Sequence, residues 1–256
     1  MANKIKTFFK LLKTLENPII YLKDYFGLIK NKPIIYRLRN GPKLKVRGGS
    51  TDRFILNEIW IHKSYLPNGF EINSNDVVVD IGAHIGVFSI MAAYYANLGK
   101  VYSFEPMKEN FNLLNENINL NRLSNITSFN KAVSDKDGKL KFFVSKTKNK
   151  GQNSMTRLSE NQEEISVDKI SFKKFIKKIP QINFLKMDCE GSEYDIFYSL
   201  NKKELAKIKK IAMEYHNYGK GTGKELREFL EKNDFSVNMI IDGKEFGTIY
   251  AINNKK

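Results

Sequence analysis

From Asp76 onward, short apolar runs alternate along the chain with segments that have helical periodicity. Val77–Ile81 is mainly apolar and stops at Gly82, and residues 85–97 then follow the spacing of a helix. Parallel strands cannot be joined by a tight turn, so they need a crossover connection, which is usually a helix. The alternation therefore predicts an α/β fold, in which helices cover both faces of a mostly parallel, doubly wound sheet.

The expected elements follow from these periodicities and from the turn residues between them. Strands are expected at 77–81, 101–104, 126–129, 139–145, 165–168, 184–187, 208–213, 237–241 and 248–252. Helices are expected at 85–97, 107–120, 171–178, 192–200 and 223–232. The last two strands form a hairpin turned at Asp242-Gly243, which adds antiparallel pairing at the end of the sheet. Residues 146–163 are polar and predict a loop.

Residues 1–69 are expected to form a basic extension, ahead of a catalytic domain predicted over residues 70–256. Its expected elements are a helix at 5–15, two strands within 34–47 turned at Asn40-Gly41, and a helix at 52–66. Pro18 and Gly27 interrupt the helical pattern between the first two of these elements.

Much of the net charge of +15 lies in this extension. Residues 1–48 hold 12 basic and 2 acidic residues, a net charge of +10. The chain has 36 lysines but only 7 arginines, and arginine is the residue suited to bidentate recognition of phosphate or guanine. The composition therefore argues against a nucleic-acid partner. The lysine-rich amphipathic segment within residues 1–30 either contacts an anionic membrane surface or packs its apolar face on the domain.

The loop after the first strand of the domain has the residue types of a ligand-binding turn. Gly82 allows a tight turn and Gly86 a close approach of the backbone, at the end of the sheet where α/β folds bind ligands. A dinucleotide fingerprint needs a third glycine where Ala83-His84 stands, and Asp80 would repel a pyrophosphate. Glu105 follows Asp80 by 25 residues, at the end of the second strand, where a carboxylate binds a ribose diol. An adenosine ligand with a cationic end, such as S-adenosylmethionine, fits this pair better than loop capping alone.

Further motifs follow in a characteristic order. They are Val79-Asp80-Ile81-Gly82-Ala83-His84-Ile85-Gly86, Phe104-Glu105-Pro106, Asn117-Ile118-Asn119-Leu120-Asn121, Lys131-Ala132-Val133-Ser134-Asp135, Phe184-Leu185-Lys186-Met187-Asp188-Cys189-Glu190-Gly191-Ser192-Glu193, and Glu214. With these motifs, residues 77–214 resemble an FkbM-type S-adenosylmethionine-dependent methyltransferase. The N-terminal 50 residues carry little of the resemblance.

The resemblance implies a Rossmann-like methyltransferase sheet and methyl transfer from S-adenosylmethionine to a hydroxyl oxygen, often on sugars or polyketides. It also implies where the cofactor lies. Asp80, Gly82, Ala83, Gly86 and Glu105 would contact it, and Ala132 would lie near the adenine. His84 stands where the family often has Asn, and both side chains can form hydrogen bonds.

An acidic cluster is expected beside the cofactor loop. Asp188, Glu190 and Glu193 follow one strand, and Glu214 and His216 end the next. Methyl transfer to oxygen needs alignment and a base for the hydroxyl proton. His216 is the first candidate for that base, Asp188 the second, and Glu214 would orient the base.

Other roles for this cluster stay open. Glu190 and Glu193 could instead serve the start of a helix, where acidic side chains are favoured, and His216 could be an ordinary loop histidine. The carboxylates of Asp188, Glu190 and Glu214 would suit a hard divalent cation, although nothing in their spacing requires one.

Asn153 and Ser154 are the candidates for acceptor contacts, within the polar stretch 148–155. A surface loop without such a function is an equally good interpretation. The single cysteine, Cys189, excludes an intrachain disulfide framework and indicates a reducing compartment. The chain shows no signal peptide and no apolar run long enough for a membrane span, so we expect a cytoplasmic protein, peripheral on the membrane at most.

The sequence thus predicts an O-methyltransferase that acts on a hydroxyl of a glycan, glycolipid or polysaccharide sugar. Two alternatives remain. The basic charge would suit an RNA methyltransferase, although the motif of amino-group methyltransferases is missing. The chain could also be a non-catalytic adenosine-ligand-binding protein at a membrane surface.

Overall fold

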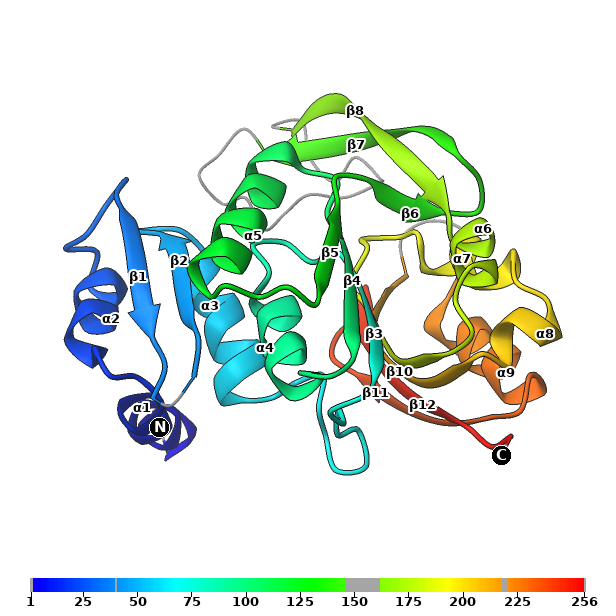
Figure 1. Cartoon of the computed structure of the whole chain (residues 1–256), viewed down its shortest axis with the longest axis horizontal. Helices are drawn as coiled ribbons and strands as arrows, with labels where there is room; N and C mark the ends of the chain where they lie inside the picture. The colour runs from blue at the N-terminus through cyan, green and yellow to red at the C-terminus, as the bar shows by residue number, and fades with distance from the viewer. Residues whose placement is uncertain (1, 40, 146–161, 218–220, 256) are drawn as a thin grey trace.

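The computed structural model describes residues 2–39, 41–145, 162–217 and 221–255. A seven-stranded sheet runs through the middle of the molecule (Figure 1). In sheet order its strands are β11 (Phe235–Ile241), β12 (Phe246–Asn253), β10 (Ile208–His216), β9 (Ile182–Met187), β3 (Val77–Ile81), β4 (Lys100–Phe104) and β5 (Ile126–Phe129). The strands from β10 to β5 are parallel, whereas β12 and β11 pair antiparallel at one edge. The predicted topology, with its antiparallel C-terminal hairpin, is confirmed.

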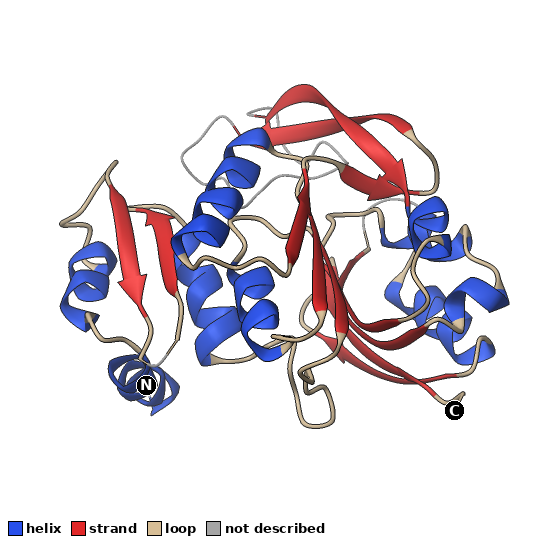
Figure 2. Ribbon diagram, in the orientation of Figure 1, coloured by secondary structure: helices blue, strands red, loops and turns tan. Residues whose placement is uncertain are grey.

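Helices cover both faces of this sheet (Figure 2). One face carries α4 (Val87–Tyr95) and α5 (Lys108–Leu120), and the other carries α6 (Phe172–Lys177), α7 (Glu193–Tyr198), α8 (Lys202–Leu205) and α9 (Gly223–Lys232). Each face has its own apolar core, because strand side chains alternate between the two faces. In β3, for example, Val78 belongs to the first core, and Val79 and Ile81 belong to the second.

A second sheet of three strands lies beside the carboxyl ends of β4 and β5. Its order is β6 (Ala132–Ser134), β8 (Gln162–Ser171), β7 (Gly138–Ser145). β8 begins within the stretch that the sequence predicts as a loop. β6 was not expected, because three residues are too few to show an alternating pattern.

The N-terminal segment packs on the same side of the sheet as α4 and α5. It contains α1 (Ala2–Thr14), α2 (Pro18–Tyr25), β1 (Pro33–Arg37), β2 (Lys43–Arg47), α3 (Asp52–Leu56) and the π-helical turn η1 (Asn57–Ile61). Leu15, Leu44 and Leu56 are fully buried in the same apolar core as Phe88 and Val101. One core therefore spans both sides of the predicted boundary at residues 69 and 70.

Two local predictions in this segment are wrong. Pro18 does not end helical structure, because it occupies the first turn of α2, where its missing N–H costs nothing. The helix expected at 52–66 ends at Ile61 and changes to π-helical geometry after Leu56. Among the described residues, the helices are too short or too polar to cross a bilayer.

Candidate cofactor and acceptor site

A cavity of about 430 Å³ lies at the carboxyl ends of β3, β4 and β9. This is the edge at which open α/β sheets bind their ligands, and the volume is in the range of small-molecule sites. Its walls come from the three strand ends, from the second sheet, and from α3 and η1 of the N-terminal segment. The polar and charged lining residues are Thr51, Glu58, His84, Glu105, Asn110, Lys131, Lys186, Asp188, Glu190, Ser192 and Glu214.

The glycine turn after β3 forms the floor of this cavity. Gly82 has a φ of +78°, and a Cβ there would overlap the backbone carbonyl of Asp188, so only glycine fits. The N–H groups of Gly82 and Ala83 both donate to the Phe104 carbonyl, at 3.0 and 2.9 Å. These bonds hold the turn against the end of β4. Gly86 is buried at the start of α4, where a side chain would collide with Leu114.

Asp80 is fully buried behind this turn rather than exposed in the cavity wall. Its carboxylate accepts a hydrogen bond from Ser89 Oγ at 2.6 Å and lies 3.2 Å from Lys186 Nζ. The same Nζ donates to the Gly82 carbonyl at 2.7 Å. Burial alone would lower the pKa of Lys186, but the Asp80 and Asp188 carboxylates raise it above its ordinary value. Asp80 thus acts on the turn through a buried ion pair.

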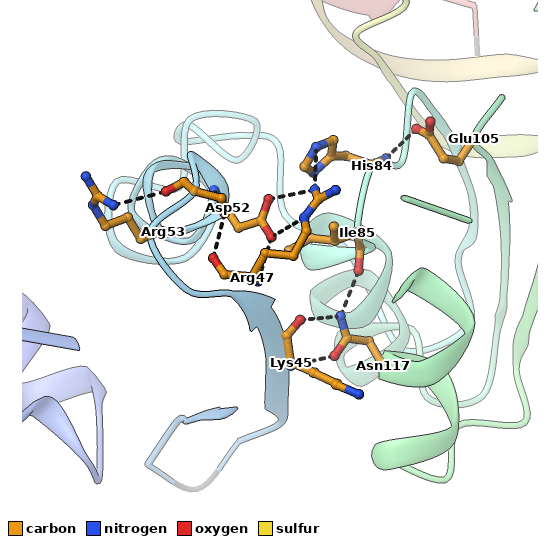
Figure 3. Close-up of polar contacts among 9 residues, drawn as sticks. Lys45, Arg47, Asp52, Arg53, His84, Ile85, Glu105 and Asn117 are labelled. Atoms are coloured by element: carbon orange, nitrogen blue, oxygen red, sulfur yellow. Dashed lines mark hydrogen bonds and ion pairs between the residues drawn. The ribbon is translucent and has the colours of Figure 1, made fainter. Parts of the chain in front are cut away.

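Glu105 faces the cavity from the end of β4, where a ribose-binding carboxylate is expected. One oxygen accepts a hydrogen bond from the backbone N–H of His84 at 2.8 Å (Figure 3). The other accepts from the backbone N–H of Met107, also at 2.8 Å. Burial raises the pKa of Glu105 to about 7, although these hydrogen bonds oppose the shift. Ala132 lines the cavity from β6, next to Val133. These residues fit an adenosine ligand. The fixed carboxylate of Glu105 has spare lone pairs that can accept hydrogen bonds from a ribose diol, and it lies beside apolar walls.

The acidic end of the cavity brings together three predicted residues. Asp188 and Glu190 follow β9, and Glu214 lies in the neighbouring β10. Tyr65 Oη donates to Asp188 Oδ2 at 3.4 Å. Burial raises the pKa of Glu214, and the Asp188 carboxylate raises it further.

His216 is buried behind this acidic end and is held by carboxylates. Its Nδ1 lies 3.0 Å from Glu193 Oε1, and its Nε2 lies 3.5 Å from carboxylate oxygens of both Glu190 and Glu214. Burial alone would lower the pKa of His216, but the hydrogen-bonded Glu193 and Glu214 carboxylates raise it to about 11. The imidazole is therefore a cation at neutral pH, which argues against the role of proton-accepting base.

Glu58 is a cavity residue that the sequence did not single out. It lies in η1 and lines the cavity with an exposed side chain. Partial desolvation by the cavity walls, together with the Asp188 and Glu214 carboxylates, raises its pKa to about 7. Glu58 lines the same cavity as Asp188 and Glu214, which follow it by more than 120 residues in the sequence. A local sequence pattern cannot show this proximity. The resemblance also gave no signal here, because it is weak in the N-terminal segment.

The remaining predictions concern a metal and the acceptor loop. Asp188, Glu190 and His216 each offer one ligand atom, and these atoms lie within 4.8 Å of one another. A protonated imidazole cannot bind a metal, so a cation there would first have to displace the proton. Asn153 and Ser154 lie outside the described residues.

The sheet, the glycine turn and Glu105 define a domain of the S-adenosylmethionine-dependent methyltransferase class. The chain belongs to the methyltransferase FkbM domain family, whose sequence profile matches residues 80–237. The matched range covers more than half of the chain and ends within β11.

Individual relatives are more distant. The 31-O-demethyl-FK506 methyltransferase FkbM of Streptomyces tacrolimicus is 26% identical, over 78% of this chain and 88% of that protein. The AMB antimetabolite synthetase AmbE of Pseudomonas aeruginosa is 22% identical over 78% of this chain, which spans only 11% of AmbE. The crystal structure of a methyltransferase FkbM from Methylobacillus flagellatus KT has a TM-score of 0.50 and 16% identity, over 73% of this chain and 47% of that one. The likeness to this last structure shows the shared fold.

Proposed function

We propose that the protein transfers a methyl group from S-adenosylmethionine to a hydroxyl oxygen of a sugar in a glycan, glycolipid or polysaccharide. The observation that carries the proposal is the acidic end of the cavity, where Glu58, Asp188 and Glu214 lie beside the cofactor turn. Carboxylates accept hydrogen bonds from hydroxyl groups, which a sugar offers in number. The Streptomyces tacrolimicus relative is a 31-O-demethyl-FK506 methyltransferase, which supports oxygen as the acceptor atom.

S-adenosylmethionine supplies an electrophilic methyl group on a sulfonium, and the products are a methyl ether and S-adenosylhomocysteine. The chain has to align the acceptor oxygen and take its proton as the new C–O bond forms. Glu58 is the best-matched proton acceptor, because a carboxyl pKa of about 7 suits a base at neutral pH. Asp188 and Glu214 would hold the acceptor hydroxyl, and the His216 cation fixes Glu214 and Glu190.

This function is tested by incubating the purified chain with S-adenosylmethionine and a panel of free hexoses, nucleotide sugars and short RNAs. Mass spectrometry then detects S-adenosylhomocysteine and the methylated product. We expect turnover with a sugar, and a drop in kcat of about 10²-fold or more in Glu58→Gln. Glu228→Gln, which changes an exposed carboxylate on α9, is the matched control and should leave kcat unchanged. Cofactor binding without turnover on any acceptor would favour a non-catalytic adenosine-ligand-binding protein. Methylation of the RNA would favour an RNA methyltransferase.

We further propose that residues 18–28 contact an anionic membrane surface. Part of the apolar face of α1 is used in the core, because Leu11 and the following Leu15 are buried there, although Phe8 and Phe9 are exposed. By contrast, Ile19, Phe26 and Leu28 are 67%, 70% and 72% exposed. Lys23 lies between them in sequence and Lys30 follows two residues after Leu28. Apolar side chains interleaved with lysine are typical of segments that lie in the headgroup region.

Flotation with phosphatidylglycerol-containing and pure phosphatidylcholine vesicles tests this contact. We expect the chain to float with the anionic vesicles, and the triple variant Ile19→Ser, Phe26→Ser, Leu28→Ser to lose this binding. The control is the pair Leu98→Ser, Ile241→Ser, because these side chains are as exposed but lie in other parts of the fold, at 75% and 73%. Equal flotation of the triple variant and the control would overturn the membrane contact.

A further inference from the structure

A polar cluster joins the N-terminal segment to the cofactor turn. Arg47, at the end of β2, forms a two-pronged ion pair with Asp52, with Nε to Oδ2 at 2.9 Å and Nη2 to Oδ1 at 2.8 Å. The Arg47 Nη2 atom also lies 3.4 Å from Nε2 of His84, in the turn after β3 (Figure 3). Asp52 therefore fixes a guanidinium group against the imidazole of a residue that lines the cavity.

This contact determines which nitrogen of His84 carries its proton. A guanidinium has only donors, so Nε2 has to accept, and the proton of the neutral ring lies on Nδ1. The ring is neutral because burial lowers the pKa of His84 to about 4. Nδ1 is thus a hydrogen-bond donor.

That donor has no acceptor within the described part of the chain. His84 Nδ1 is buried and unpartnered there, and the same holds for Thr51 Oγ1, which belongs to another residue of the cavity lining. Buried polar groups in native proteins are nearly always paired, so two such groups in the lining of one cavity indicate a ligand that supplies acceptors. Arg47 Nη1 is also buried without a partner.

The position of this wall limits which part of a ligand it can reach. The backbone N–H of His84 donates to Glu105, the carboxylate placed for the ribose diol. In S-adenosylmethionine, the amino-acid portion extends from the ribose through the sulfur, and its carboxylate is an acceptor-only anion. The Nδ1 donor of His84, whose ring contacts a guanidinium, and the Thr51 hydroxyl match a carboxylate in hydrogen-bonding type.

We propose that His84 and Thr51 bind the carboxylate of the methionine portion of the cofactor, with Arg47 as the positioning residue that fixes the His84 tautomer. This assignment rests on the proposed use of S-adenosylmethionine. It gives the N-terminal segment, which carries little of the family resemblance, a direct part in holding the cofactor.

Two ligands separate this subsite from the rest of the cofactor site. S-adenosylhomocysteine carries the carboxylate, whereas 5′-methylthioadenosine keeps the adenine, ribose and sulfur but lacks the amino-acid portion. By calorimetry, we expect His84→Ala to bind S-adenosylhomocysteine about tenfold or more weakly, and to bind 5′-methylthioadenosine like the unmodified chain. Thr51→Val should show the same selective loss, and His84→Asn and Thr51→Ser, which keep a donor, should restore most of it.

The contrary outcomes are distinct. Equal weakening of both ligands in His84→Ala and Thr51→Val, or no weakening of either, would overturn the subsite. Failure of the unmodified chain to bind either ligand would instead overturn the proposed function. The tautomer has its own readout, because ¹⁵N NMR of the unmodified chain should show Nδ1 of His84 protonated and Nε2 unprotonated. The opposite pattern would contradict the role of Arg47.

Discussion

At the scale of single residues, the ionisable groups around the cavity are of two kinds. Asp80 with Lys186, and Glu193 with His216, are buried ion pairs that hold the walls in place. Glu58 and Glu105 instead line the cavity. Burial raises the pKa of Glu105 to about 7, and partial desolvation with the neighbouring Asp188 and Glu214 carboxylates raises that of Glu58 to about 7. The first kind is expected to govern stability, and the second kind the pH dependence of binding and catalysis.

Glu105 predicts a pH dependence of cofactor binding. The ionised carboxylate accepts hydrogen bonds from a ribose diol, and protonation removes part of that capacity, so affinity should rise as pH increases through about 7. Calorimetry with S-adenosylhomocysteine between pH 5.5 and 8.5 measures it. In Glu105→Gln, we expect binding about tenfold weaker at high pH and nearly independent of pH. Glu58→Gln is the comparison, and its affinity for S-adenosylhomocysteine should depend on pH as in the unmodified chain. If the affinity of Glu58→Gln does not depend on pH, the titrating group is Glu58 and not Glu105.

His216 predicts a pH dependence of stability. Its pKa is about 11 in the folded chain and about 6.5 when unfolded, so its stabilisation is full below pH 6.5. This stabilisation is lost progressively as pH rises from 6.5 towards 11. His216→Gln leaves Glu193 buried without its cation and should lower the free energy of unfolding by about 3–5 kcal/mol at pH 6, and by less at pH 10. Urea unfolding at both pH values checks this, with the exposed His62→Gln as control. An equal loss at both pH values would show that the charge of His216 is not the cause.

The sequence could predict only part of this chemistry. Gly82 and Glu105 stand at strand ends, in contexts that a strand pattern and a motif make recognisable. The role of Lys186 is different, because it depends on which carboxylates surround a buried strand position. The charge of His216 likewise depends on its direct contact with Glu193, a residue for which the sequence left the acidic cluster and a helix start as alternatives. Glu58 lines the same cavity as residues at the ends of β9 and β10, a proximity that no local pattern shows.

At the scale of elements, two asparagines attach α5 to the edge strand β2. Asn117 Oδ1 accepts from the Lys45 N–H at 2.6 Å, and its Nδ2 donates to the carbonyls of Lys45 and Ile85 at 3.0 and 2.9 Å (Figure 3). Asn121, one turn later, makes the same pair of bonds with the backbone of Lys43. The two side chains thus satisfy backbone groups that β2 would otherwise leave unpaired.

These two positions form a matched pair for mutation. Asn117 is fully buried and also holds the cofactor turn through Ile85, whereas Asn121 is more exposed. Asn117→Ala should therefore lower the free energy of unfolding by about 3 kcal/mol, and Asn121→Ala by about 1 kcal/mol or less. Urea unfolding with unchanged m values would measure both. Equal effects would show that water replaces the bonds of Asn117 as easily as those of Asn121.

Elements were predictable where a pattern was long or where a turn residue marked its end. The strands β3, β4 and β5 and the helix α5 match their predicted ranges to within a residue or so, because buried β-branched runs and helical spacing mark them. α2 was missed because Pro18 suits either the end or the start of a helix.

At the scale of the whole molecule, the N-terminal segment is part of the folded unit that contains the site. It supplies Thr51, Glu58 and Tyr65 to the cavity, and its leucines share a core with α4. The sequence suggested a separate extension, because the family motifs and the change in charge both begin later. Neither signal reports on buried contacts, which decide where a folding unit ends.

A fragment of residues 70–256 should consequently fail to fold as the full chain does. Removing the N-terminal segment would expose the apolar side of α4, including Val87, Phe88 and Met91, which are buried in the full chain. We expect this fragment to aggregate, or to unfold without a cooperative transition in urea, as followed by circular dichroism. A fragment with a native-like transition that binds S-adenosylhomocysteine as tightly as the full chain would restore the boundary that the sequence suggested.

The burial of Lys186 makes the chain suited to footprinting with amine-reactive reagents. Lysine is abundant in this sequence, and most lysines in the described residues are at least partly exposed, so a reagent that acetylates amines would label the native surface densely. Lys186 is only 3% exposed and donates to both Asp80 and Gly82, so it should react only when the cofactor turn opens. Its labelling rate, measured by mass spectrometry with and without S-adenosylhomocysteine, would therefore report how often the empty site opens, before any acceptor is known.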